Sequence, residues 1–222
     1  MSHLPSLPPA PAVYLITDRR KLKSSPGSDL VQDLIEFIDR AFASGIDMVQ
    51  IRERDLPARI ICQIALAASK TAARYSGKVL VNDRADVAAA AGVGVHLTTR
   101  SVDVDAIRRS FGKDLLIGAS THSLLEAVSA EQQGADFLVF GPVFETESKR
   151  VYGSPVGVDA LAKVKAKVGL PVFALGGITL SNYRQPLDAG AAGVAGISLF
   201  AESSDLSAVM TAIKGRSNVP AQ

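Results

Sequence analysis

Short apolar runs alternate with amphipathic segments along the whole chain. Leu30, Leu34, Ile38 and Phe42 recur every four residues after the first run, which predicts a helix with one apolar face. The runs themselves are continuously apolar, as in parallel strands that are covered on both faces. The pattern predicts strands at 13–17, 48–51, 79–81, 93–97, 115–119, 137–140, 172–175 and 194–197. Helices are predicted near 30–42, 60–75, 104–110, 123–133, 161–168, 180–189 and 206–213, with another in the alanine-rich stretch between the third and fourth strands.

This order of elements predicts the fold class. Eight strand–helix units in about 200 residues favour an α/β fold of one domain, a (β/α)8 TIM barrel, over an open doubly wound sheet. We expect the barrel to span residues 13–216, with a flexible proline-rich lead-in at 1–12 and a C-terminal tail at 217–222.

Composition and charge narrow the possible partners. The 222 residues carry a net charge of only +2, and no basic run suggests nucleic acid. No stretch approaches the roughly 20 apolar residues of a membrane span, and no signal peptide pattern is present, so we expect a cytoplasmic protein that does not bind membranes. A homo-oligomer is possible, and the sequence does not decide it.

Polar residues and glycines gather at the predicted carboxyl ends of the strands, where TIM barrels carry their active sites. Gln50, Arg52 and Arg54 alternate at the end of the second strand and could face one pocket, where two guanidiniums would bind a phosphate or diphosphate. The alternative is a solvated charged loop. Lys149, on a later loop, is a candidate partner for the same anion.

Two glycine-containing ends near the C-terminus suggest a phosphate cradle. Gly176-Gly177 allows backbone N–H groups to approach an anion, and the start of the next helix adds a favourable dipole. Ile197-Ser198 follows the last strand, and the serine hydroxyl could donate another hydrogen bond. The alternative is that the glycine pair only makes a turn.

His122 is the candidate general acid–base, since its ordinary pKa near 6.5 allows proton exchange at neutral pH. It follows the fifth strand, beside Ser120, although it could instead cap the next helix. Asn82 and Asp83 end the third strand, and Asp83 could hold half of a metal–diphosphate site. The corresponding segment after the fourth strand, Thr98 to Ser101, contains no carboxylate.

With these residues in order, the chain resembles the thiamin phosphate synthase/TenI superfamily over about residues 13–215. The motifs that carry the resemblance are Val49-Gln-Ile-Arg-Glu-Arg54, Val81-Asn-Asp-Arg84, Gly94-Val-His-Leu97, Ser120-Thr-His-Ser123, Gly134-Ala-Asp136, Gly141-Pro-Val-Phe-Glu-Thr-Glu-Ser-Lys149, Ala174-Leu-Gly-Gly-Ile178 and Gly193-Val-Ala-Gly-Ile-Ser198. Each motif alone is weak evidence for the superfamily, whereas their order along a barrel is specific for it.

The resemblance implies roles for these residues. Gln50 through Arg54, Asn82, Ser120 and Lys149 match the synthase site for a pyrimidine diphosphate, and Asp83 matches a magnesium ligand. The part that holds a thiazole phosphate is matched by Thr146, Ser148, Gly177, Ile197 and Ser198. The synthase joins these substrates by expelling diphosphate, which magnesium neutralises.

Two departures from the synthase pattern are relevant. Ser101 stands where the synthase carries its second acidic magnesium ligand, with Asp103 two residues later as a possible replacement, and Arg54 stands where the synthase has lysine. Residues 122–127 and 143–146 look more like TenI, the thiazole tautomerase, whose acid–base histidine His122 matches.

We therefore expect a TenI-like tautomerase that aromatises a thiazole carboxylate phosphate without a cofactor. The first alternative is a thiamin phosphate synthase that uses Mg²⁺. The second is a noncatalytic binder of phosphorylated metabolites.

Overall fold

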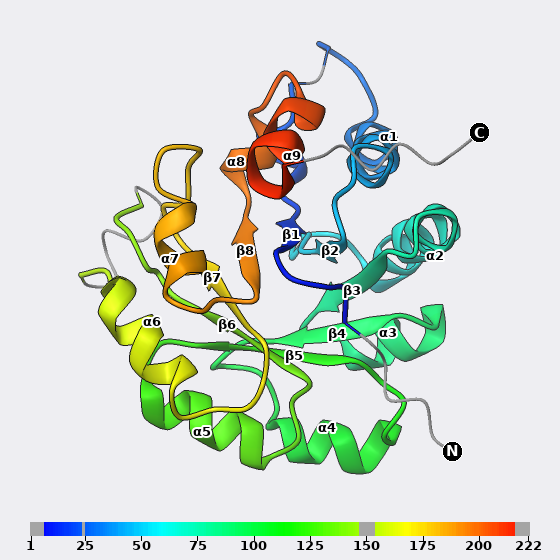
Figure 1. Cartoon of the computed structure of the whole chain (residues 1–222). Coiled ribbons are helices and arrows are strands. Elements are labelled where there is room, and N and C mark those ends of the chain that lie inside the picture. The colour runs from blue at the N-terminus through cyan, green and yellow to red at the C-terminus, as the bar shows by residue number, and fades with distance from the viewer. Residues whose placement is uncertain (1–6, 24, 147–153, 216–222) are drawn as a thin grey trace.

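Eight short strands pair in parallel in sequence order, and the pairing of β1 with β8 closes them into a barrel (Figure 1). The computed structural model describes residues 7–23, 25–146 and 154–215. The strands are β1 Ala12–Ile16, β2 Met48–Ile51, β3 Lys78–Asn82, β4 Gly94–Leu97, β5 Ile117–Thr121, β6 Phe137–Phe140, β7 Val172–Leu175 and β8 Gly193–Gly196. The predicted single-domain (β/α)8 barrel is confirmed.

Helices surround the barrel, and α1 and α9 lie side by side where the chain closes on itself (Figure 1). They are α1 Leu30–Ala43, α2 Ala58–Arg74, α3 Ala85–Ala91, α4 Val104–Phe111, α5 Leu124–Gln132, α6 Gly157–Lys165, α7 Arg184–Asp188, α8 Ser198–Ala201 and α9 Leu206–Lys214, with a 3₁₀ turn η1 at Arg19–Lys21. As predicted, α1 buries one face, which includes Leu34, Ile38 and Phe42.

Some boundaries differ from the sequence prediction. Strand β5 begins at Ile117 and runs through Ser120 and Thr121, because its pairing with β6 continues to Thr121 and Phe140. Helix α6 begins at Gly157, four residues before the expected start, and α7 is a short helix. The sequence pattern did not predict η1 or α8, which are each too short to show an apolar period.

Strand side chains alternate between two apolar clusters. Val13 and Leu15 point outward and pack with the helices, whereas Tyr14 points into the barrel. There it meets Phe137 and Phe173 edge-on, with ring centroids 5.7 and 5.9 Å away. Gly118 makes room for these rings, because a Cβ at this position would come within 2.3 Å of Phe137. The barrel interior is therefore filled, and a ligand can enter only at an end of it.

The N-terminal segment is the part that the sequence predicts to be a flexible lead-in. Leu7 packs against the inner cluster, while residues 1–6 and 216–222 lie outside the described part, so the flexibility expected of 1–12 and the tail at 217–222 stay predictions. None of the helices in 7–23, 25–146 and 154–215 combines the length and the hydropathy needed to cross a bilayer.

Candidate active site

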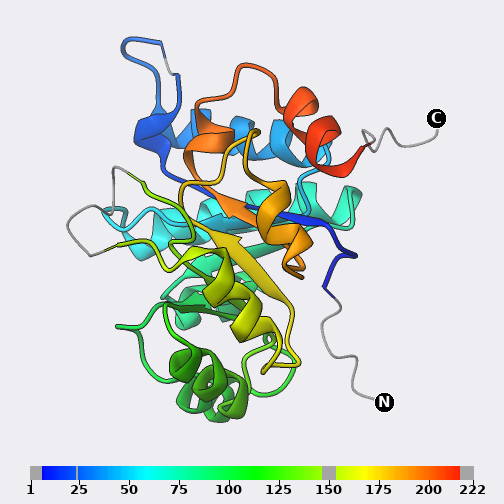
Figure 2. The same cartoon turned by 60° about the vertical axis from the view of Figure 1, so that its left-hand side comes forward.

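The carboxyl ends of β2, β3, β5, β6, β7 and β8 and the connections that follow them bring the described site residues to one end of the barrel. Because all eight strands are parallel, their carboxyl ends share this end. Figure 2 shows the barrel from the side, with the connection between β1 and α1 in blue and that between β6 and α6 in yellow-green extending from the same end. We call this end the mouth.

Arg52 provides positive charge at the β2 side of the mouth. Its side chain is partly buried, and among the described residues no carboxylate lies within ion-pair distance of it. Burial lowers its pKa, and the positive charge of Arg54 lowers the pKa further. A guanidinium that is desolvated beside another cation is stabilised by an anion, so this corner is suited to bind one.

Gln50 and Arg54 differ from Arg52 in their surroundings. The Gln50 side chain is 2% exposed and lies in the barrel interior, whereas Arg54 is exposed in the turn after β2. The expected common orientation along β2 therefore ends at Ile51, the last residue of the strand, beyond which the chain turns.

A buried hydrogen-bond network extends from Gln50 to the mouth. The Gln50 amide donates to the Tyr14 hydroxyl (3.1 Å), which lies 3.3 Å from His96 Nδ1, and His96 Nε2 lies 2.8 Å from Ser120 Oγ. Burial lowers the pKa of His96 to about 3, with a further contribution from Arg52, so the ring is neutral near pH 7.

One assignment of donors and acceptors along this chain of hydrogen bonds gives every donor an acceptor. If Tyr14 donates to Nδ1, the His96 proton resides on Nε2 and is donated to Ser120, and we assign this tautomer. The Ser120 hydroxyl then keeps its own proton to donate to a ligand. Neither Tyr14 nor His96 was among the predicted site residues, because Tyr14 lies inside an apolar run and the sequence favours a packed, hydrogen-bonded structural role for His96 at the end of the fourth strand.

His122 lies at the mouth directly after β5, and its side chain is exposed. Its Nδ1 atom donates to the carbonyl of Gly141, which leaves Nε2 as the ring atom that can accept a proton. Its backbone N–H donates to Glu126 Oε2 (2.6 Å), and Ser123, not His122, caps α5. The geometry thus favours the acid–base role over the capping alternative.

Asp83 is an exposed carboxylate at the end of β3. Its backbone has a φ of 66°, which is unusual for a residue other than glycine, and its N–H donates to the carbonyl of His96 (2.8 Å). Asn82, the last residue of β3, is partly buried beside it. The strand end is therefore held in a fixed conformation that exposes the Asp83 carboxylate.

The segment where the resemblance places a second metal ligand forms a turn after β4. Ser101 Oγ accepts the Thr98 N–H (2.7 Å) and closes a turn, and Asp103 is the residue before α4. Within the described ranges no group of three or more His, Cys, Asp or Glu side chains could hold a metal ion. Mg²⁺ often binds through one or two carboxylates together with substrate phosphates, and Asp83 alone fits that kind of binding.

The glycine pair after β7 packs against the connection after β6. Gly177 has a φ of 64°, and a Cβ at this position would lie 2.3 Å from the carbonyl oxygen of Glu145. Gly176 accepts a hydrogen bond from the Phe144 N–H (3.0 Å). Glycine is thus required for the close contact between these connections. The role of the glycine pair in binding phosphate stays a prediction.

Ile197 and Ser198 begin α8, which is the short extra helix that often helps to bind phosphate in TIM barrels. Its first N–H groups have no partners within the helix. Lys21, on η1, donates to Ser198 Oγ (3.1 Å) and forms an ion pair with Glu202 (2.9 Å). Lys21 was missed because it is 177 residues away from Ser198 in the sequence.

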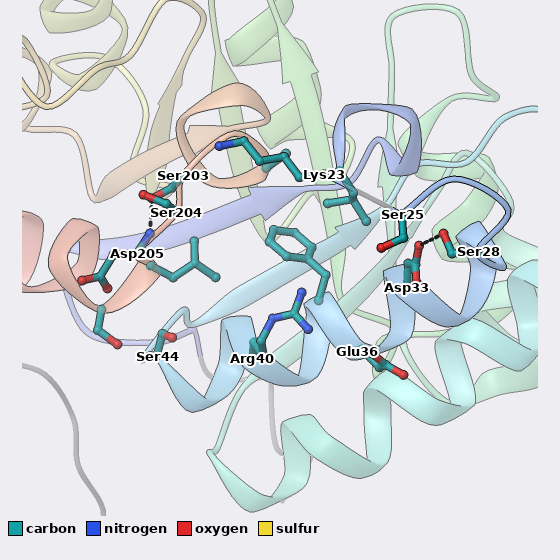
Figure 3. A pocket seen from close by; sticks show the side chains of 15 residues that line it. Lys23, Ser25, Ser28, Asp33, Glu36, Arg40, Ser44, Ser203, Ser204 and Asp205 are labelled. Carbon is teal, nitrogen blue, oxygen red and sulfur yellow. Dashed lines mark hydrogen bonds between the residues drawn. The ribbon is translucent and has the colours of Figure 1, made fainter.

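Three predicted residues have little or no description. Thr146 is partly buried at the edge of the described chain, and Ser148 and Lys149 lie outside the described residues. A cavity of about 500 Å³ lies beside the mouth, between α1 and the α8–α9 connection (Figure 3). Lys23, Arg40 and Ser203 line it, and none of the predicted site residues does.

Comparison with known proteins assigns the family. A sequence profile described as thiamine monophosphate synthase matches residues 13–200. The chain belongs to this family. The thiamine monophosphate synthase family makes thiamin phosphate, so the chain is a member of a family of thiamin biosynthesis enzymes.

Individual members of the thiamine monophosphate synthase family support the same assignment. A candidate thiamine-phosphate synthase of Geobacter sulfurreducens is 45% identical over 188 residues, which cover 84% of this chain and 85% of that protein. A thiamine-phosphate synthase of Clostridium botulinum is 34% identical over 87% of this chain and 92% of its own length. The structure of a thiamine phosphate pyrophosphorylase from Pyrococcus furiosus superposes with a TM-score of 0.80 at 32% identity, covering 92% of this chain and 94% of that one. These names favour the synthase alternative over the tautomerase that we expected from Ser101 and His122.

Proposed function

We propose that this protein is a thiamin phosphate synthase, which joins a pyrimidine diphosphate to a thiazole phosphate and releases diphosphate. The observation that carries the proposal is the presence of two separate places for anions at one mouth. One is Arg52, directly after β2, a partly buried cation with no described carboxylate partner. The other is the start of α8 with Ser198. Since β2 and β8 flank β1 on opposite sides, two phosphorylated substrates can bind together.

The side chains of this protein would then act as follows. Arg52 and Arg54 bind the diphosphate and stabilise the negative charge that develops as it leaves. Ser120 donates its hydroxyl proton to the same group, oriented by His96. The Asp83 carboxylate is the residue that would hold Mg²⁺, which when bound neutralises the leaving diphosphate. Ser198 and the backbone around Gly177 bind the thiazole phosphate.

A thiazole tautomerase is the second candidate, and two observations favour it. Ser101 offers a hydroxyl that is already bonded in a turn in place of a carboxylate, and His122 has one ring nitrogen fixed on Gly141 and the other available for a proton. This reaction moves a proton on one phosphorylated substrate and needs no diphosphate site, so it leaves Arg52, which has no carboxylate partner among the described residues, without a role.

One pair of assays on the purified protein separates the candidates. The first measures Mg²⁺-dependent release of diphosphate from hydroxymethylpyrimidine diphosphate with thiazole phosphate, and the second measures aromatisation of the thiazole carboxylate phosphate. We expect turnover in the first assay, with Arg52→Met lowering kcat/KM at least tenfold and His122→Gln changing it less. Turnover only in the second assay, abolished by His122→Gln, would contradict the proposal, and binding without turnover in either would favour a noncatalytic binder.

The missing ligand gives a second test of the synthase proposal. Ser101→Asp adds a carboxylate at the position that the family pattern fills with an acid, so the Mg²⁺ concentration for half-maximal activity should fall. Asp103, two residues farther along the chain, is the other candidate for the missing ligand. We expect Asp103→Asn to leave the Mg²⁺ requirement unchanged, and a raised requirement in this variant would assign the second ligand to Asp103. An unchanged Mg²⁺ requirement in Ser101→Asp would contradict a role for Asp83 in holding the metal.

A further inference from the structure

Lys21 already binds an anion in this structure, and that anion is a carboxylate of the same chain. Its ammonium group lies 2.9 Å from Glu202 Oε1 and 3.1 Å from Ser198 Oγ. Hydrogen bonds from Lys21 and then from Ser198 lower the pKa of Glu202, so the carboxylate is ionised at neutral pH. Lys21, Ser198 and Glu202 thus form an anion site at α8 that Glu202 itself occupies.

The backbone that carries Lys21 is firmly attached. Asp18 caps η1, and Arg19, two residues before Lys21, donates to Glu53 (2.9 Å) and to Asp55 (2.6 and 2.8 Å) on the connection after β2. Glu53 is 3% exposed and also accepts from Thr17 (2.7 Å). The backbone of Lys21 is therefore already ordered close to the mouth, and only its side chain has to adjust when a ligand arrives.

The bond between Lys21 and Glu202 is, in contrast, easy to exchange. The two side chains are 39% and 55% exposed, and exposed ion pairs contribute little to stability because water and salt screen them. A phosphate carries up to two charges and three acceptor oxygens, so it is a stronger acceptor for an ammonium and a hydroxyl than one carboxylate is.

We propose that Lys21 is a binding residue for the phosphate of the thiazole substrate, and that Glu202 occupies its place until the phosphate displaces it. The inference rests on the phosphate cradle of the proposed function, which both candidate reactions share. It predicts opposite effects for the two partners of one ion pair. Loss of Lys21 removes a ligand to the phosphate, whereas loss of the Glu202 charge removes its competitor.

The test measures binding of inorganic phosphate at pH 8 by NMR titration, without catalysis. All variants are made in an Arg52→Met background, so that the diphosphate corner does not contribute. We expect Lys21→Met to weaken binding about tenfold, Lys21→Arg to restore most of it, and Glu202→Gln to tighten it about threefold. Lys23→Met is the matched control and should change binding much less than Lys21→Met, because Lys23 lines the cavity beside α1 (Figure 3) and acts on Glu202 through its charge without a hydrogen bond.

Two results would overturn the inference. One is unchanged binding in Lys21→Met, and the other is equal weakening in Lys23→Met, which would indicate only the general positive field of the loop. Activity is measured separately: the expected binding pattern without turnover refutes the proposed reaction and leaves Lys21 as a phosphate ligand. Turnover of the wild-type protein together with an unaltered phosphate affinity in Lys21→Met would support the proposed reaction and refute Lys21 as a phosphate ligand.

Discussion

The buried His96 ring should make this barrel sensitive to acid. In the unfolded chain the pKa of His96 takes its ordinary value near 6.5, whereas burial lowers it to about 3 in the folded protein. Between these values the unfolded state binds the additional proton, so stability falls as the pH falls below about 6.5 and the loss continues to about pH 3. At pH 5 the expected loss from this residue is about 2 kcal/mol.

Urea unfolding at pH 7 and pH 5 measures this loss, and His96→Gln isolates it. Glutamine does not titrate, and its amide can still bond to Ser120 and Tyr14, the partners that His96 has in the barrel. We expect the free energy of unfolding of the wild-type protein to fall by about 2 kcal/mol more than that of the variant over this pH range. Carboxylates titrate in both proteins and cancel in the comparison. An equal fall in both would refute the neutral, buried His96 and the tautomer that orients Ser120.

Two further predictions concern stability and the mouth. Arg108→Met should lower the free energy of unfolding by about 2–3 kcal/mol in urea denaturation, because the largely buried guanidinium bonds Asp136 (2.9 Å) and the Gly134 carbonyl (2.7 Å). The control is Arg109→Met, whose side chain is 70% exposed: it should change the free energy of unfolding by less than about 0.5 kcal/mol, and similar losses in the two variants would contradict this account. Gly177→Ala should lower the free energy of unfolding by at least about 1 kcal/mol, because of the positive φ and the contact with Glu145, and should raise the KM for the thiazole phosphate. An unchanged KM with lowered thermal stability would mean that the glycine only makes the turn.

Much of the barrel was predictable because its local patterns agree with its global order. Strands β2, β6 and β7 have the predicted bounds. Strands β6 and β7 are continuous apolar runs that end before a glycine, and β2 is apolar except for Gln50 and ends before Arg52. The prediction of β5 was wrong by two residues because Ser120 and Thr121 are polar and yet belong to the strand. Ser120 is accommodated there by its hydrogen bond to His96, which no local pattern contains.

The site residues were predicted from their residue types and their positions at strand ends, and the structure shows which contacts they make. Gln50 was expected to face a ligand beside Arg52, but it lies inside the barrel and bonds Tyr14. Lys21 was not considered, because one lysine in a charged loop has no distinguishing sequence signal, and only the closure of β1 onto β8 brings it to Ser198.

The sequence by itself determined the order of strands and helices, the family, and the end of the barrel where the polar residues gather. These follow from hydrophobic periodicity and short motifs, which are properties of neighbouring residues. Only the tertiary structure decided which side chains are bonded to one another: Tyr14 with His96, Arg19 with Glu53, and Lys21 with Glu202. Such contacts join residues that are far apart in the chain, and they arise only when the parallel strands close and bring their carboxyl ends together.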